Sequence, residues 1–429
     1  MPEKQRTYFC IDMKTFYASV ECAERGLDPF ETDLIVADVT RGKNAICLAI
    51  TPKMKAQGIK NRCRLFDIPA NIKYIAARPR MQLYIDYAAD IYAIYLKYFD
   101  AADIHVYSID ESFIDVTAYL GIYNMTPKQL AKTIMNDILT TLHIPSTAGI
   151  GTNLYLAKIA LDITAKHCHD HMGYLDEELY KKTLWDHQPI TDFWQIASGT
   201  ARRLAKYGLT TMRAVANFPE AILYKTFGIN AELLIDHAWG RESCRISDIK
   251  SYKTHSKSLS FSQILPRDYA RDEAVTVLKE MVYNACRELV KRHCIAARVW
   301  VGIGYSYGKH DATAAGLRLS GATARPSAIM PAVLDSFERA LTPNVPIRKL
   351  SLSLCDLKSE ISEGYDLFCD PQSVNREISA GKAVVDITER FGKNAVLRGI
   401  NFCEGATQRE RNEMIGGHRA GYDDPRTAR

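Results

Sequence analysis

Two adjacent acids, Asp110 and Glu111, lie at the centre of an apolar stretch, residues 106–116. Branched and aromatic residues on both sides predict two short β-strands that meet at residues 109–111. Because neighbouring side chains on a strand point to opposite faces, a turn is needed to bring both carboxylates to one site. Two carboxylates held that close repel each other unless a cation lies between them. The pair is therefore either the solvated tip of a hairpin or part of a cation site.

A third acid, Asp12, ends an apolar strand near the N-terminus, and an aromatic pair, Phe16 and Tyr17, then opens a predicted helix. On its own Asp12 could serve as a helix N-cap. Beside Asp110 and Glu111 it would complete a three-carboxylate site for a hard divalent cation. Mg²⁺ fits such a site, because it prefers oxygen ligands and keeps waters and substrate phosphates in its shell.

Three motifs in this sequence resemble those of the Y-family, or translesion, DNA polymerases. They are Asp-x-x-x-Phe-Tyr-Ala at 12–18, Ser-Ile-Asp-Glu-Ser-Phe at 108–113, and the stretch 148–160 with its Gly-Ile-Gly-Thr-Asn turn. They occur in the family's order and at similar spacing, and the resemblance covers approximately residues 6–358. The remainder looks like the UmuC-type branch from Gram-positive bacteria.

The resemblance implies that two Mg²⁺ ions are bound by Asp12, Asp110 and Glu111, with the backbone carbonyl of Met13. It also implies that Tyr17 is the steric gate, whose ring collides with a ribose 2′-hydroxyl. The residues expected to bind the incoming nucleotide are Phe16, Tyr17, Thr51, Lys55 and Lys158. Glycines at a strand-to-helix turn, such as those at 149 and 151, can let the backbone approach phosphate.

The order of predicted elements indicates an α+β multidomain fold. Strands alternate with helices around the three acids, which suits a mixed sheet backed by helices. The resemblance implies a right-hand polymerase with a ferredoxin-like palm, small fingers, a helical thumb and a β-α-β-β-α-β little finger. The expected boundaries are palm 1–26 and 79–175, fingers 27–78, thumb 176–246, linker 247–257, little finger 258–358 and C-terminal tail 359–429.

Residues 194–209 of the expected thumb resemble a helix–hairpin–helix. In that motif the backbone amides at a helix N-terminus hold a DNA phosphate without reading sequence. Ser198, Gly199 and Thr200 would make this contact, although Ala-Ser-Gly replaces the usual Gly-x-Gly. The alternative is an ordinary helix pair.

Several cations lie on or beside the predicted strands of the little finger. Such charges usually mark a solvated face, but cations gathered on one face of a sheet could straddle a DNA backbone. The residues expected to contact DNA are Lys257, Arg298, Arg318 and Arg348.

The tail contains residues 363–368, which resemble a sliding-clamp-binding peptide. Tyr365, Leu367 and Phe368 would contact the clamp, although Gly364 and Tyr365 depart from the first two positions of that peptide. The helix predicted after it could dock a partner or the protein's own body, and the sequence leaves both open.

The length and composition of the chain limit the number of domains and the class of protein. A chain of 429 residues is too long for one ordinary core. Its 47% hydrophobic and 24% charged residues are normal for a globular protein. The sequence has no apolar stretch of bilayer length and no signal-peptide pattern at its start, so we expect a cytoplasmic protein without membrane contact. The net charge of +5 permits nucleic-acid binding without demonstrating it.

The sequence is most consistent with an error-prone translesion DNA polymerase that adds dNTPs to the primer of a primer–template DNA. By resemblance it would act as a monomer in DNA damage tolerance or the SOS response, aided by a sliding clamp. One alternative is a nucleotide cyclase on a related palm, which would lack the segments after residue 176. The other is a catalytically silent DNA- and clamp-binding subunit, which would have lost one of the acids.

Overall fold

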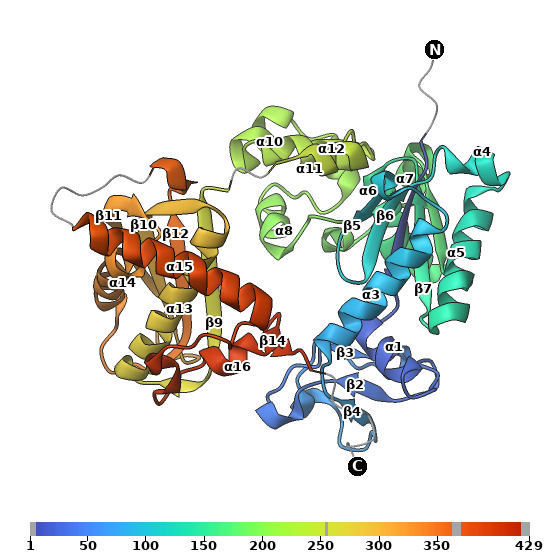
Figure 1. The fold of residues 1–429 in the computed structure, drawn as a ribbon. Helices are drawn as coiled ribbons and strands as arrows, with labels where there is room; N and C mark the ends of the chain where they lie inside the picture. Colours follow the sequence, from blue (N-terminus) through green and yellow to red (C-terminus); the bar gives the residue numbers. More distant parts are fainter. Residues whose placement is uncertain (1–5, 254–255, 363–369, 422–429) are drawn as a thin grey trace. The chain divides into compact units, whose positions relative to one another are not determined.

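The computed structural model describes residues 6–253, 256–362 and 370–421 (Figure 1). These residues form two compact units. The first contains the chain up to Tyr252 together with the C-terminal residues from His418, and the second runs from Lys253 to Gly417. None of the described helices is long and apolar enough to cross a bilayer.

The palm is built on a five-stranded sheet in the order β5-β6-β1-β7-β8. The central strand β1 is antiparallel to both β6 and β7, whereas β7 and β8 are parallel. Without β8, the chain order is β-α-β-β-α-β, as expected for the ferredoxin-like palm. The strands are β1 (Tyr8–Met13), β5 (Ile104–Val106), β6 (Glu111–Asp115), β7 (Ser146–Gly151) and β8 (Met172–Leu175).

The strands of this sheet are buried almost throughout, because helices cover it. Helix α5 packs on β7 and on α3, whereas α6 packs on β1 and β7. A π-helical turn, Ala160–Thr164, continues α6. The palm helices are α3 (Met81–Leu96), α4 (Tyr119–Tyr123), α5 (Pro127–Leu142) and α6 (Leu154–Ile159).

The fingers form a small three-stranded sheet in the order β3-β2-β4, with its own apolar core. Pro52 occupies the first turn of the short helix α2, where its missing N–H costs nothing. The elements are α1 (Phe16–Ala23), which leads in from the palm, β2 (Leu34–Val36), β3 (Ala49–Ile50), α2 (Pro52–Ala56) and β4 (Ile75–Ala77).

The thumb is helical and is held by one apolar cluster that also includes residues of α6. Its helices are α7 (Glu177–Thr183), α8 (Ser198–Ala205), α9 (Met212–Ala216), α10 (Glu220–Phe227), α11 (Asn230–Trp239) and α12 (Ile246–Ser251).

The second unit contains the little finger, whose β-α-β-β-α-β element order matches the prediction. Its sheet order is β11-β10-β12-β9, with every neighbouring pair antiparallel. Helices α13 and α14 pack against the sheet. The elements are β9 (Ser258–Tyr269), α13 (Arg271–Lys291), β10 (Cys294–Tyr305), β11 (Thr313–Thr323), α14 (Pro326–Ala340) and β12 (Ile347–Cys355).

The tail helix α15 packs along α13 of the little finger (Figure 1). One face of α15 is therefore in contact with the protein itself. Glu280 of α13 then accepts hydrogen bonds from Asn401, Thr407 and Gln408, which extends the attachment. The residues of the clamp-like peptide, Tyr365, Leu367 and Phe368, lie outside the described residues. The tail elements are β13 (Lys358–Ser359), α15 (Pro371–Phe391), α16 (Gln408–Asn412), β14 (Met414–Ile415) and β15 (His418–Arg419).

Candidate active site

The three predicted acids meet at one end of the central palm strands. Asp12 and Glu111 are directly opposite each other on β1 and β6, so their side chains share one face of the sheet with Cβ atoms about 5 Å apart. Asp110 immediately precedes β6, and its carbonyl accepts a 2.9 Å hydrogen bond from the Met13 N–H. The Ser108 hydroxyl donates to the Asp110 carboxylate at 2.6 Å. The turn expected from the sequence is therefore present.

The charges of these acids act on one another. Burial, together with the negative charges of Asp110 and Glu111, raises the pKa of Asp12 to about 8. Asp12 is thus costly to ionise in the protein alone. A cation among the three carboxylates would remove that cost, which is the behaviour of a metal-binding carboxylate cluster.

Glu111 is held by two neighbours. Lys158 of α6 places its ammonium 2.8 and 2.9 Å from the two carboxylate oxygens, and the Cys10 thiol donates to Oε1 at 3.0 Å. Lys158 is only 8% exposed and also pairs with Asp162 at 3.2 Å. Burial lowers the pKa of Lys158, but the charges of Asp162 and Glu111, with the hydrogen bond to Glu111, outweigh it and raise the pKa above its usual value. Lys158 is therefore a cation directed at Glu111.

Two glycines bring α6 this close to the sheet. A Cβ atom at Gly149 would lie 2.0 Å from the Ala157 carbonyl oxygen, and one at Gly151 would lie 2.1 Å from the Ala157 nitrogen. Both positions therefore require glycine for helix–sheet packing, which differs from the phosphate approach suggested by the sequence. The Asn153 side chain caps α6 by accepting from the Leu156 N–H at 2.8 Å.

The donor set fits Mg²⁺ in its chemistry. Asp12 and Asp110 offer hard oxygen ligands, and Mg²⁺ accepts one or two carboxylates with water and phosphate completing its shell. Among the described residues, no group of three His, Cys, Asp or Glu side chains is arranged to hold a metal. Glu111 would have to exchange its contact with Lys158 before all three acids could share an ion.

The charge of Asp12 acts on two lysines, Lys55 and Lys14. Burial lowers the pKa of Lys55 on α2, while the charge of Asp12 raises it and that of Lys166 lowers it. Burial and the charge of Lys55 likewise lower the pKa of Lys14, whereas the charge of Asp12 raises it. Sequence reasoning identified Lys55 but missed Lys14 and Lys166. The position of Lys14, two residues past Asp12 at a strand end, was an available signal.

Tyr17 lies beside the acids. Its ring stacks on that of Tyr84 with centroids 4.5 Å apart and planes 18° apart. Burial and the charge of Asp110 raise the pKa of Tyr17, and the charge of Arg62 lowers it. An aromatic ring held flat against a second ring, next to a carboxylate, is suited to limiting the space available to a sugar.

Two of the residues predicted to contact the nucleotide have side chains that lie in the core. Phe16 is 2% exposed, and Thr51 is fully buried. The Thr51 hydroxyl donates to the Thr32 carbonyl at 2.7 Å and accepts from the Leu34 N–H at 3.3 Å. A nucleotide contact by either residue would therefore use its backbone.

A buried ionic network supports Tyr84. Its hydroxyl donates to Glu21 at 2.7 Å, and Arg80 donates twice to the same carboxylate at 2.9 and 2.8 Å. Arg25 also pairs with Glu21. The network fixes α3 against α1, and so holds the ring on which Tyr17 stacks.

Replacing Arg80 with alanine is expected to lower the free energy of unfolding by about 3 kcal/mol, because it leaves a buried carboxylate short of its main partner. Urea denaturation measures the loss. The matched control is Lys97→Ala, which removes an exposed ion pair with Asp137 at 3.2 Å and should cost less than about 1 kcal/mol. Equal losses in both variants would contradict the role of the network.

The raised pKa of Asp12 predicts a pH effect on stability. Between about pH 4 and the folded pKa of about 8, the folded protein keeps the Asp12 proton that the unfolded chain has lost. Unfolding then releases a proton, so the free energy of unfolding falls as pH rises through this range. Urea denaturation in EDTA from pH 5 to 9 should show a steeper fall for the wild type than for Asp12→Asn. Parallel profiles would disprove this assignment.

The thumb residues predicted to bind DNA begin helix α8. Ser198, Gly199 and Thr200 form its first turn, as the helix–hairpin–helix reading requires. Gly199 and Thr200 also line a hollow of about 530 Å³ with three cations that the sequence analysis did not select: Arg202, Arg203 and Lys206. The first turn of α8 and three cations therefore line the same hollow.

The little-finger cations are only partly gathered on one face. Arg298 and Arg318 are opposite each other on β10 and β11, on the sheet face away from the core. Arg298 pairs with Asp356 at 3.3 Å, and Arg348 pairs with Asp268 at 3.9 Å. Lys257 is exposed just before β9.

Comparisons with known proteins agree with this architecture. Residues 11–162 match the model of the impB/mucB/samB family, and residues 256–367 match the model of the C-terminal domain of that family. Together these matches cover more than half of the chain.

Individual relatives extend over nearly the whole length. A DNA polymerase IV 2 of Bacillus subtilis (strain 168) is 30% identical, over 97% of this chain and 99% of its own. The UvrX protein of the same strain, named for UV-damage repair, is 29% identical over 97% of this chain and 98% of its own. A solved Y-family DNA polymerase chimera of Dbh and Dpo4 shares the fold with a TM-score of 0.62 and 20% identity, over 82% of this chain and 98% of its own.

Proposed function

This chain belongs to the impB/mucB/samB family, the Y-family translesion DNA polymerases, and from that premise we propose how it adds deoxynucleotides to a primer 3′-hydroxyl. The observation that carries the proposal is the convergence of Asp12, Asp110 and Glu111 at one end of β1 and β6, beside Lys55 of the fingers. Acids next to a cationic side chain are what a nucleoside triphosphate with its metal requires.

The carboxylates would hold two Mg²⁺ ions, with the Met13 carbonyl as a further oxygen ligand. When bound, such ions lower the pKa of the attacking hydroxyl and neutralise charge on the leaving phosphates. Asp12 and Asp110 keep their oxygens at the strand ends, where a primer terminus and a triphosphate can meet. Because positioning and charge stabilisation carry most of the rate in phosphoryl transfer, the chain needs no nucleophile of its own.

The lysines would bind the triphosphate. Lys55 approaches from the fingers, and Lys14 from the end of β1. Lys158 has a second task, since its ammonium now compensates Glu111 and Asp162. We infer that Lys158 keeps the Glu111 carboxylate correctly placed until the substrate arrives, and then shares its charge with the phosphates. Phe16 and Thr51 would contribute through their backbone.

DNA would be held through its backbone by two surfaces. The first turn of α8 can bind a phosphate with its free amides, and Arg202, Arg203 and Lys206 add positive charge around it. On the little finger, Arg298 and Arg318 would follow a second stretch of phosphates. Neither surface reads base edges, which suits a polymerase that must accept distorted template.

Several finer features belong to the same proposal. The enzyme would act as a monomer in the cytoplasm, in DNA damage tolerance and the SOS response of the UmuC-type branch, and a sliding clamp would bind residues 363–368. The helical segment after residue 176 and the little finger count against a nucleotide cyclase, which would lack both. The presence of all three acids counts against a silent subunit.

Primer extension tests the proposal directly. Purified protein with Mg²⁺, dNTPs and a labelled primer–template should lengthen the primer, and EDTA should stop it. Extension should also continue opposite an abasic site, where no template base directs insertion. A protein that is folded by circular dichroism and binds the duplex, yet never extends undamaged template, would refute the polymerase assignment.

A further inference from the structure

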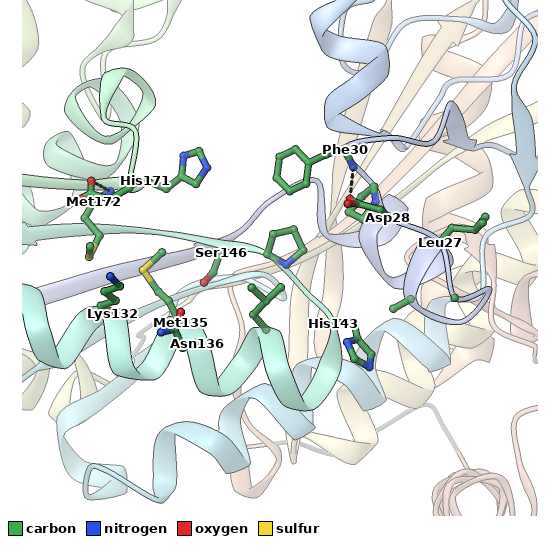
Figure 2. A pocket seen from close by; sticks show the side chains of 16 residues that line it. Leu27, Asp28, Phe30, Lys132, Met135, Asn136, His143, Ser146, His171 and Met172 are labelled. Carbon is green, nitrogen blue, oxygen red and sulfur yellow. Dashed lines mark hydrogen bonds between the residues drawn. The ribbon is translucent and has the colours of Figure 1, made fainter.

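A second cavity lies on the flank of the palm, away from the carboxylates. It has a volume of about 750 Å³ and is bounded by the loop after α1, by α5, and by the first residues of β7 and β8. Figure 2 shows side chains from these segments around one space, with Lys132 and Met135 on α5, Phe30 on the loop and Ser146 on β7. This volume falls within the range of small-molecule sites. None of Asp12, Asp110 and Glu111 lines it.

Ser146 provides the first sign of a ligand. Its side chain lines the cavity, the residue is only 5% exposed, and its Oγ has no hydrogen-bond partner among the described residues. Buried hydroxyl groups are nearly always hydrogen-bonded, because an unpaired one loses its hydration without compensation. A polar group in the cavity would supply the missing bond.

The walls define the rest of the ligand. Phe30, Met135, Leu139 and Pro145 make most of the surface apolar, and an aromatic ring and a proline offer flat faces. An aromatic or similarly flat apolar body would therefore remove the most surface from water.

The lining holds one cation, Lys132, that an anion could reach. Asp170 is already paired with Lys128 at 2.6 Å, and Asp28 accepts the Phe30 N–H at 2.8 Å. Lys132 and His143 are exposed at the cavity and, within the described part of the chain, no ion pair occupies Lys132. An anionic group would thus find an available ammonium.

We propose that this cavity binds a small aromatic anion, with its ring against Phe30 and Pro145, a polar atom on the Ser146 hydroxyl and its charge toward Lys132. The site is distinct from the one that holds the incoming nucleotide. The two sites meet at Lys14, whose backbone N–H donates to the Pro145 carbonyl at 2.8 Å and whose ammonium lies 3.2 Å from His171 Nδ1. Binding should need neither DNA nor Mg²⁺.

Calorimetric titration with 1-naphthyl phosphate, in EDTA and without DNA, tests this proposal independently of polymerase activity. We expect saturable one-to-one binding by the wild type and no binding of inorganic phosphate alone. Ser146→Ala should weaken binding roughly five- to tenfold, the usual value of one hydrogen bond. Lys132→Glu should weaken it at least tenfold, whereas Lys182→Glu, the same charge change on exposed α7, should leave it unchanged.

Two controls keep the result decisive. Because Ser146 Oγ has no partner, Ser146→Ala should keep the wild-type melting temperature, so a loss of affinity reports the hydroxyl and not unfolding. Lys55→Ala should bind the probe like the wild type, which places the probe outside the nucleotide site. Unchanged affinity in both Ser146→Ala and Lys132→Glu, or equal binding of inorganic phosphate, would overturn the proposal.

Discussion

Replacing Asp110 with alanine is expected to abolish primer extension, lowering kcat/KM by roughly a thousandfold or more. Bound metal ions stabilise the charge of the transition state in phosphoryl transfer by several kcal/mol, and each 1.4 kcal/mol changes the rate by about a factor of ten. Asp110 is available to a metal ion, because no cation pairs with its carboxylate among the described residues and only the Ser108 hydroxyl donates to it. Single-turnover extension with saturating dNTP measures the chemical step.

The fold should survive this change. Asp110 makes its structural hydrogen bond to Met13 through the backbone, which alanine retains. Asp90→Ala, on the exposed face of α3, is the matched control and should extend primers at the wild-type rate. If Asp110→Ala kept more than a tenth of the activity while Asp90→Ala kept all of it, the carboxylate could not be a ligand of the catalytic ions.

The sequence could predict those parts of the site that depend on local pattern. Asp12, Asp110 and Glu111 each lie next to a predicted apolar strand, and the motifs that resemble those of Y-family polymerases implied that the three share one site. The element order of the little finger could be predicted from its sequence patterns. Alternating apolar and polar residues indicate each strand, and apolar residues at helical spacing indicate each helix. The position of Arg298 opposite Arg318 did not follow from the sequence, because the register of β10 and β11 shifts between Ala296 and Arg298.

Contacts that depend on packing between distant segments could not be predicted. Lys158 matches a position in the motif of the polymerase family. Its pairing with Glu111, however, depends on the close packing of α6 on the palm sheet, which Gly149 and Gly151 allow. The same holds for the cavity, whose lining comes from three separate segments. The burial of Thr51 likewise could not be predicted: its hydroxyl makes both of its hydrogen bonds inside the fingers.

The tail illustrates an ambiguity that only packing resolves. The apolar face of a helix after residue 370 could pack on a partner protein or on its own chain, because either one would offer an apolar surface. Packing against α13, together with the bonds to Glu280, assigns it to the little finger. The apolar stripe of α15 is therefore no evidence for a partner.

Replacing Tyr17 with alanine should admit ribonucleotides, raising the kcat/KM for an rNTP relative to its dNTP by roughly a hundredfold. Selection against one added hydroxyl depends on a rigid obstacle, since a merely apolar pocket discriminates weakly. Tyr17 is rigid because its ring stacks on Tyr84 at 4.5 Å, and Tyr84 is fixed in turn by Glu21. Steady-state incorporation of each nucleotide on one template gives the ratio.

The support of the ring can be separated from the ring itself. Tyr84→Leu keeps Tyr17 but removes the surface on which it stacks, so sugar discrimination should fall by a smaller factor, roughly three- to tenfold, as expected for loss of one aromatic contact. Tyr87→Leu, on the same helix but bonded to Glu24 at the surface, is the matched control and should discriminate like the wild type. If Tyr17→Ala left the ratio unchanged, the gate would lie elsewhere. If only Tyr84→Leu left it unchanged, Tyr17 would be a gate that needs no support from α3.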